Sequence, residues 1–236
     1  MITVVKSDGT TQKISSDKFT ASAPCPPPKP MWQYVAAYQA GHAVADLYCG
    51  IPIGCAEIGF RGAEIEGHIT ESGWMAVDQP RYIFLRGVTC SAGCTAMQLF
   101  ADVEVGMPDD AVQSGIALAR QGKPQHEAAI FADAYLCAAP DADDAEILAV
   151  WRECEKAAYA LFQHRRVWNA VKRVAKALLE RGSLIENDII RAAKMGTTVS
   201  NCLVDGLAYD ELTRAREKWL ASSRFAAAAT AVTAEL

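Results

Sequence analysis

The chain has 236 residues, 51% hydrophobic and 22% charged, and its 23 basic and 28 acidic residues give a net charge of −5. This composition excludes an intrinsically disordered chain, which combines low hydrophobicity with high net charge. No apolar run reaches the roughly 18–20 residues that span a bilayer, and the first residues lack the basic and apolar regions of a signal peptide. Without a polybasic run, duplex nucleic acid is not expected as a ligand. We expect a cytoplasmic globular protein with no membrane partner, built from one or two domains.

Eight cysteines are scattered among apolar neighbours, and no two of them form a C-x-x-C pair. A disulfide-stabilised domain would be shorter and denser in cysteine. A zinc ribbon or a thioredoxin-type site would need the C-x-x-C spacing. The cysteines are therefore interpreted as reduced thiols that pack as small hydrophobic side chains.

Residues 1–30 are interpreted as an N-terminal arm. Ile2–Val5 and Thr11–Ile14 flank Asp8-Gly9, a dipeptide typical of hairpin turns. Five of the ten prolines then fall within residues 24–30. They predict an extended linker, because proline removes a backbone donor and clashes inside a helix. The main domain is expected at 31–195, followed by a C-terminal extension at 196–236.

The main domain is predicted to be mainly α-helical with a small β-sheet. Residues 32–49 predict a helix from apolar residues at three- and four-residue spacing, ended by Gly50-Ile51-Pro52. Short strands at 55–60 and 63–69 are predicted to join at Arg61-Gly62. Further helices are expected at about 82–103, 109–121, 125–138, 143–181 with a break near His164, 185–194, and 209–229 in the extension. Trp219 would dock this last helix.

The first long helix contains Tyr38-Gln39-Ala40-Gly41-His42-Ala43, which resembles the zinc motif H-E-A-G-H-A of the FtsH-type metallopeptidase domain. In that motif, two histidines four residues apart bind one zinc ion from the same helix face. The glutamate accepts a proton from the zinc-bound water.

The resemblance covers about residues 33–192, with segments in matching order. Phe60-Arg61-Gly62 stands at a P-R-G-like turn, and residues 93–97 stand at a G-R-A-A-E segment. Asp109–Arg120 matches a helix with an acidic start and an L-A-R end, and residues 174–180 and 184–189 match the last helix pair. The resemblance implies an FtsH-peptidase-like helical domain with a small β-sheet beside the motif helix. The nucleotide-binding motif G-x-x-x-x-G-K-[ST] of the family's ATPase part does not occur in the sequence.

The catalytic residues that the resemblance implies are replaced here. Tyr38 stands at the first histidine, and a phenol with a pKa of about 10 is a poor zinc ligand near neutral pH. Gln39 stands at the glutamate and cannot accept a proton from water. His42 remains as a candidate metal ligand, and the family's third ligand, an aspartate, falls beside Asp110. This pattern indicates a pseudopeptidase with no resident cofactor.

A rebuilt zinc site is the alternative at these positions. Cys90 and Cys94 lie four residues apart on one predicted helix, so both thiols could join His42 at a metal ion. The other interpretation is that Cys90 and Cys94 are buried structural thiols and that His42 is a hydrogen-bonded helix histidine.

Residues 163–166, together with Lys172, Arg173 and Lys176, concentrate positive charge on one predicted helix. This run is interpreted as a solvated helix face or as a surface for an acidic partner.

Three hypotheses about function follow. The first is an inactive peptidase-like domain that binds a protein or peptide of unknown identity, as an inhibitor or adaptor. It would use the groove beside the motif helix, where the family holds an extended peptide on a sheet edge. The second is an active zinc-dependent peptidase with a ligand set and base drawn from His42, Asp110, Cys90, Cys94 or Glu57. The third is that Tyr38 and Gln39 are deliberate replacements, since Glu-to-Gln is a common inactivating change.

Overall fold

The structure is a computed structural model that describes residues 2–5, 11–14, 31–61, 64–71, 80–193 and 206–226. The proline-rich segment 24–30 and the turn at 62–63 lie outside the described residues. In chain order the elements are β1 (Ile2–Val5), β2 (Thr11–Ile14), α1 (Met31–Cys49), β3 (Ile53–Arg61), β4 (Glu64–Glu71), α2 (Pro80–Ala101), α3 (Asp109–Arg120), α4 (Glu127–Ala138), α5 (Asp144–Gln163), α6 (Arg165–Arg181), β5 (Ser183–Ile185), α7 (Glu186–Ala193) and α8 (Gly206–Ser222).

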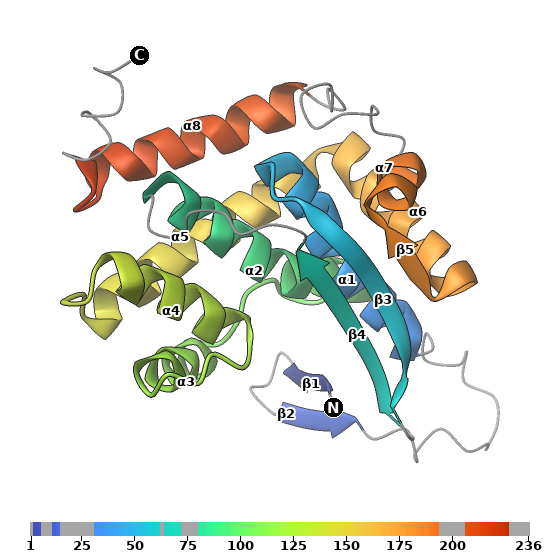
Figure 1. Cartoon of the computed structure of the whole chain (residues 1–236), viewed down its shortest axis with the longest axis horizontal. Coiled ribbons are helices and arrows are strands. Elements are labelled where there is room, and N and C mark those ends of the chain that lie inside the picture. Colours follow the sequence, from blue (N-terminus) through green and yellow to red (C-terminus); the bar gives the residue numbers. More distant parts are fainter. Residues whose placement is uncertain are drawn as a thin grey trace.

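The described part of the chain is mainly helical, as predicted, and it carries two small antiparallel sheets (Figure 1). The predicted pairing of β1 with β2 is confirmed, with Ile2 opposite Ile14, and the predicted turn at Asp8-Gly9 lies outside the described residues. The predicted break near His164 is also confirmed, because this residue adopts an extended conformation between α5 and α6. No helix among the described residues is long and apolar enough to cross a bilayer.

The larger sheet has the strand order β4-β3-β5. The predicted pairing of β3 with β4 is confirmed, with Phe60 opposite Ile65. The third strand, β5, is a correction, because the sequence predicts a helix from residue 185 and no strand before it. Gly182, with a φ of +76°, ends α6 and turns the chain so that Ser183–Ile185 runs antiparallel to β3. A three-residue strand is too short to show a period-two pattern.

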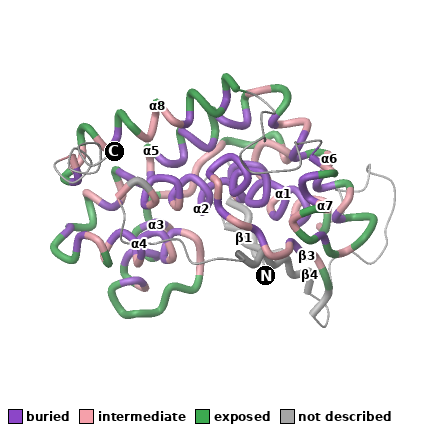
Figure 2. The backbone as a smooth tube through the Cα atoms, turned by 45° about the horizontal axis from the view of Figure 1, so that its top comes forward, coloured by how far each residue is buried: buried purple, intermediate pink, exposed green. Residues whose placement is uncertain are grey.

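Helix α1 lies at the centre of the molecule and packs against α2, α6, β3 and β4. From residue 35 to residue 49 every side chain is buried except Tyr38, which is half-buried (Figure 2). A helix that is apolar on all sides is expected to be covered on all sides. The small sheet packs on α1 through β3 and β4, so the predicted position of a sheet beside this helix is confirmed.

Helix α8 packs on α2 and α5 through an aromatic cluster. The Trp219 ring stacks on Phe84 at a centroid distance of 5.5 Å and also contacts Phe225. The prediction that Trp219 docks this helix is thus confirmed. The helix ends at Ser222, seven residues before its predicted end. The hydroxyls of Ser222 and Ser223 donate to carbonyls of the last turn, a local hydrogen bond that competes with helix continuation.

Candidate functional site

His42 is held where α1 crosses α2. Its Nδ1 lies 2.7 Å from the carbonyl oxygen of Thr89. Because a carbonyl only accepts, Nδ1 carries the proton and Nε2 keeps its lone pair. The pKa of His42 is lowered to about 4, mainly because the ring is buried; the hydrogen bond to Thr89 raises this pKa and nearby Arg86 lowers it, both by less than burial does. The imidazole is therefore neutral at pH 7.

Two glycines allow this close crossing of helices. A Cβ atom at Gly93 of α2 would lie 2.2 Å from Nε2 of His42. A Cβ atom at Gly41 of α1 would lie 2.5 Å from Cβ of Ala96 and 2.7 Å from the carbonyl oxygen of Ala92. Real Cβ atoms do not come so close to their neighbours, so both positions require glycine. The small residues around His42 thus serve helix packing.

Tyr38 and Gln39 stand at the positions where the sequence differs from H-E-A-G-H-A. The Tyr38 ring meets the His42 ring edge-on, with centroids 4.6 Å apart, so both side chains share one face of α1. The Gln39 side chain is 3% exposed, and its Oε1 has no hydrogen-bond partner within the described part of the chain. This corner of the molecule therefore combines a phenol, an amide and a neutral imidazole.

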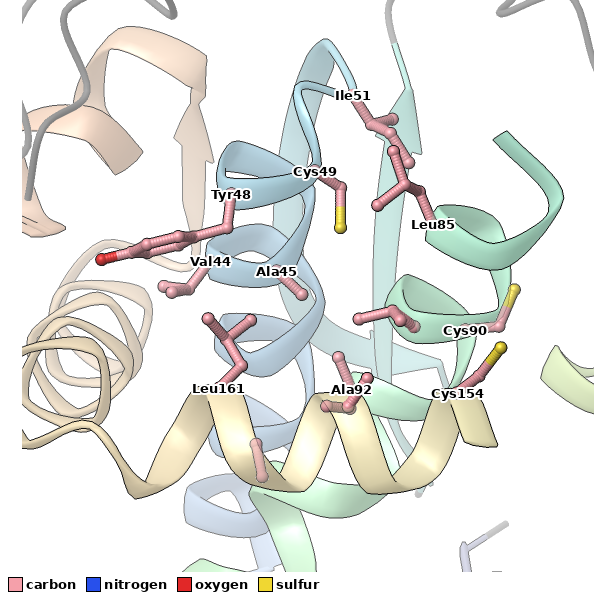
Figure 3. Packing of buried hydrophobic residues seen from close by; sticks show 14 of the residues in the cluster. Val44, Ala45, Tyr48, Cys49, Ile51, Leu85, Cys90, Ala92, Cys154 and Leu161 are labelled. Carbon is pink, nitrogen blue, oxygen red and sulfur yellow. The ribbon is translucent and has the colours of Figure 1, made fainter. Parts of the chain in front are cut away.

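The proposed rebuilt site of His42, Cys90 and Cys94 is not formed. Thr89 and Gly93 occupy the face of α2 that meets His42, whereas the thiols lie one position further round the helix and approach α5. Figure 3 shows Cys90 beside Cys154 of α5. Burial, followed by the nearby Glu155 and Cys90, raises the pKa of the Cys94 thiol to about 12. The Cys94 thiol is therefore protonated at pH 7.

Asp110 is also separated from His42. It lies exposed in the first turn of α3, where its Oδ1 accepts from the backbone N–H of Ala111. Helix α3 packs against α4 and α5, whereas His42 is buried between α1 and α2. Across the ranges that the structure describes, no three His, Cys, Asp or Glu residues come together as a group able to hold a metal ion. The candidate ligands His42, Asp110, Cys90 and Cys94 therefore do not form one site.

Glu57, a candidate base, lies on β3 and is exposed. Its Oε1 accepts a hydrogen bond from the Ser183 hydroxyl of β5 at 3.1 Å, so it takes part in joining the two strands. Sequence reasoning did not find this contact, because the two residues are 126 positions apart.

In the part of the chain that the structure describes, β4 forms an unpaired edge of the sheet beside α1. Strand β3 is central, β5 covers three of its residues on one side, and β4 pairs with β3 on the other. Among the described strands, none pairs with the outer edge of β4. An uncovered strand presents a row of backbone N–H and C=O groups that can pair with another chain.

Comparison with protein-family models finds no matching family, and comparison with curated proteins finds no match.

Proposed function

We propose that this chain is a non-catalytic, peptidase-like domain that binds an extended segment of a protein partner along the free edge of β4. The free edge is the observation that carries the proposal, because β-strand addition requires an unpaired strand of adequate length. Strand β4 has eight residues, and alternate residues of a strand direct their backbone groups to opposite edges. About four of them can therefore pair with an incoming segment.

The chemistry of Tyr38, Gln39 and His42 supports a non-catalytic role. Hydrolysis needs a group that accepts a proton from the attacking water, and the Gln39 amide cannot do so. His42 is neutral, but its Nδ1 is engaged by Thr89 and its Nε2 is packed over Gly93. The surrounding residues are thus suited to holding α1 in place.

The sequence of β4 favours a basic partner segment. The strand holds Glu64, Glu66 and Glu71 and has no Lys or Arg. Opposite charges on paired strands are each worth roughly 0.2–1 kcal/mol, whereas like charges oppose pairing. A partner segment with Lys or Arg at alternate positions would therefore bind best.

Two proline variants of β4 test this mode of binding. Peptides would first be selected from a random library against the purified protein, and their affinity measured by fluorescence anisotropy. Gly67 and His68 are neighbours, so their N–H groups point to opposite edges of the strand. Gly67→Pro and His68→Pro thus form a matched pair. In one variant the proline removes a backbone N–H that points to the unpaired edge of β4. In the other variant it removes the N–H that donates a hydrogen bond to β3.

We expect the outward proline to weaken peptide binding at least tenfold without lowering the thermal midpoint. The other proline should lower the thermal midpoint. A selection that yields no peptide, or peptides that bind equally well to both variants and the parent, would overturn the proposal.

Zinc content separates this proposal from an active peptidase with an altered ligand set. Protein purified without chelators should contain less than about a tenth of a zinc ion per chain, measured by elemental analysis. Near one zinc per chain, lost in His42→Ala, would instead support the peptidase.

A further inference from the structure

Charge is distributed unevenly along the chain. Residues 109–146, which comprise α3, α4 and the start of α5, contain eight Asp and Glu but two Lys and Arg. Residues 165–193, which comprise α6, β5 and α7, contain seven Lys and Arg but three Asp and Glu. The net charge of −5 for the whole chain therefore conceals a strongly acidic part and a basic part.

These two parts lie at opposite ends of the molecule. In Figure 1, which has the longest axis horizontal, α3 and α4 lie at the left and α6 and α7 at the right. Figure 2 shows the same separation after a turn of 45°. Helix α5 connects the two ends, beginning at the acidic one and ending beside α6. The protein is thus electrically polar along its length.

The basic face is formed by Arg165, Lys172 and Lys176. They lie seven and four residues apart on α6, so they share one side of the helix over about 17 Å. All three are exposed, and within the described chain neither Arg165 nor Lys172 has a carboxylate partner. Leu179, three residues after Lys176 on α6, is 37% exposed, and Ile185 of β5, a strand that packs against α6, is 55% exposed. Apolar side chains next to charged ones are typical of an interface with a polar rim.

The acidic end is formed by Asp141, Asp143 and Asp144, which are exposed at the start of α5. Each uses its Oδ1 inside the fold: Asp141 accepts from Arg224, Asp144 accepts from Arg120, and Asp143 caps the helix. Apart from the backbone N–H of Asp141, which contacts its own carboxylate, no further donor among the described residues reaches these carboxylates. Each aspartate therefore retains an oxygen that can accept from another molecule.

We propose that copies of this chain associate head to tail, with the basic face of one copy on the acidic end of the next. The two surfaces have opposite charge and lie at opposite ends, so one copy can offer both at once. A contact between two different surfaces does not close after two copies, so it produces chains or rings. This association is independent of the β4 edge.

The primary test is sedimentation velocity of the full chain over about 5–500 µM, at about 20 mM and about 500 mM NaCl, because the higher salt screens exposed charges beyond a few ångströms. We expect the weight-average sedimentation coefficient to rise with concentration at low salt and to stay at the monomer value at high salt. A monomer at every concentration in low salt would overturn the proposal.

Charge reversal tests which surfaces meet. Lys172→Glu with Lys176→Glu reverses two of the three cations of the basic face, and Asp141→Lys with Asp144→Lys reverses two of the three carboxylates of the acidic end. Each double variant alone should associate at least tenfold more weakly, and a mixture of the two should associate again. If the second pair fails to fold, Ala145→Lys adds a cation at the same end without breaking an ion pair.

A matched control reverses two exposed cations outside both surfaces, Lys156→Glu with Lys218→Glu. It changes the net charge by the same amount as the basic-face variant and should leave association unchanged. Equal weakening by both variants would show a general effect of net charge and would contradict the head-to-tail contact. Persistent association of either reversed variant alone would contradict it as well.

Discussion

The imidazole of His42 lies directly over Gly93, so that a methyl group on Gly93 would come within 2.2 Å of Nε2. The position of His42 is therefore set by a glycine on the neighbouring helix. The hydrogen bond from Nδ1 to Thr89, one turn earlier on α2, fixes the ring from its other side.

Gly93→Ala should destabilise the protein by about 1–3 kcal/mol, because the added methyl group overfills the helix crossing. Gly206→Ala at the start of α8 is the matched control, since a Cβ atom there meets nothing within 4 Å. Urea unfolding measures the change in the free energy of unfolding for each of the two variants. In the double variant His42→Ala with Gly93→Ala the clash is removed, so the two effects should not add. Additive effects would show that the imidazole is not what Gly93 accommodates.

Acid should destabilise the protein through His42. Its pKa is about 4 in the folded state, against an ordinary value of 6.5. Between these pH values the unfolded chain binds a proton at this position and the folded chain does not, so the free energy of unfolding falls as the pH falls from 6.5 to 4. The full effect is about 3 kcal/mol.

The difference between the parent and His42→Asn isolates this contribution, because other titrating groups are common to both proteins. Asparagine retains an N–H donor for Thr89 but does not titrate. The variant should lose less stability than the parent between pH 7 and pH 4.5. Parallel pH profiles would show that His42 does not titrate as described.

Thiol reactivity should follow burial. Cys137 is exposed, whereas Cys49, Cys90 and Cys154 are buried, and the pKa of Cys94 is raised to about 12. Since the thiolate is the reactive form, iodoacetamide at pH 8 should modify Cys137 in the native protein at least a hundredfold faster than Cys94. Peptide mapping by mass spectrometry measures each rate. Fast modification of Cys94 in the native protein would contradict the packing of its thiol, on α2, against α5.

Trp219→Ala should release α8 from the rest of the protein. The ring is 7% exposed and stacks on Phe84, and truncating a buried tryptophan costs about 3–5 kcal/mol. Amide exchange in α8 should accelerate, while exchange in α1 stays slow. Tyr209→Ala removes a ring that is 51% exposed on the same helix and serves as the control. Equal acceleration by the two variants would rule out the aromatic anchor.

Restoring the motif tests the proposed scaffold. Tyr38→His with Gln39→Glu places two imidazoles on the face of α1 where the Tyr38 and His42 rings now meet. Metal binding would also require the His42 ring to turn so that Nε2, which packs over Gly93 in the parent, faces the new histidine. The double variant should bind Co²⁺, seen in its visible absorbance, and adding His42→Ala should abolish binding. No Co²⁺ binding by the double variant would count against a peptidase-like scaffold.

Much of the fold follows from local patterns in the sequence. Three predicted features depend only on residues that are neighbours in the sequence, and all three are present in the structure. They are the end of α1 before Gly50-Ile51-Pro52, the break between α5 and α6 at His164, and the pairing of β3 with β4. The separation of Cys90 and Cys94 from His42 could not be predicted. A spacing of four residues on one helix shows that the two thiols share a face. Which neighbouring helix this face meets depends on how α2 packs between α1 and α5.

The hydrogen bond from Ser183 to Glu57 joins parts of the chain that are made far apart in time. At about 5–20 residues per second, the ribosome needs roughly 6–25 s to add the 126 residues between them. During this interval β3 has one edge without β5, and a nascent strand with an open edge can pair with neighbouring chains. The sheet is completed only after most of the helices have been synthesised. Slower translation therefore prolongs the exposure of β3 and favours aggregation of the newly made protein.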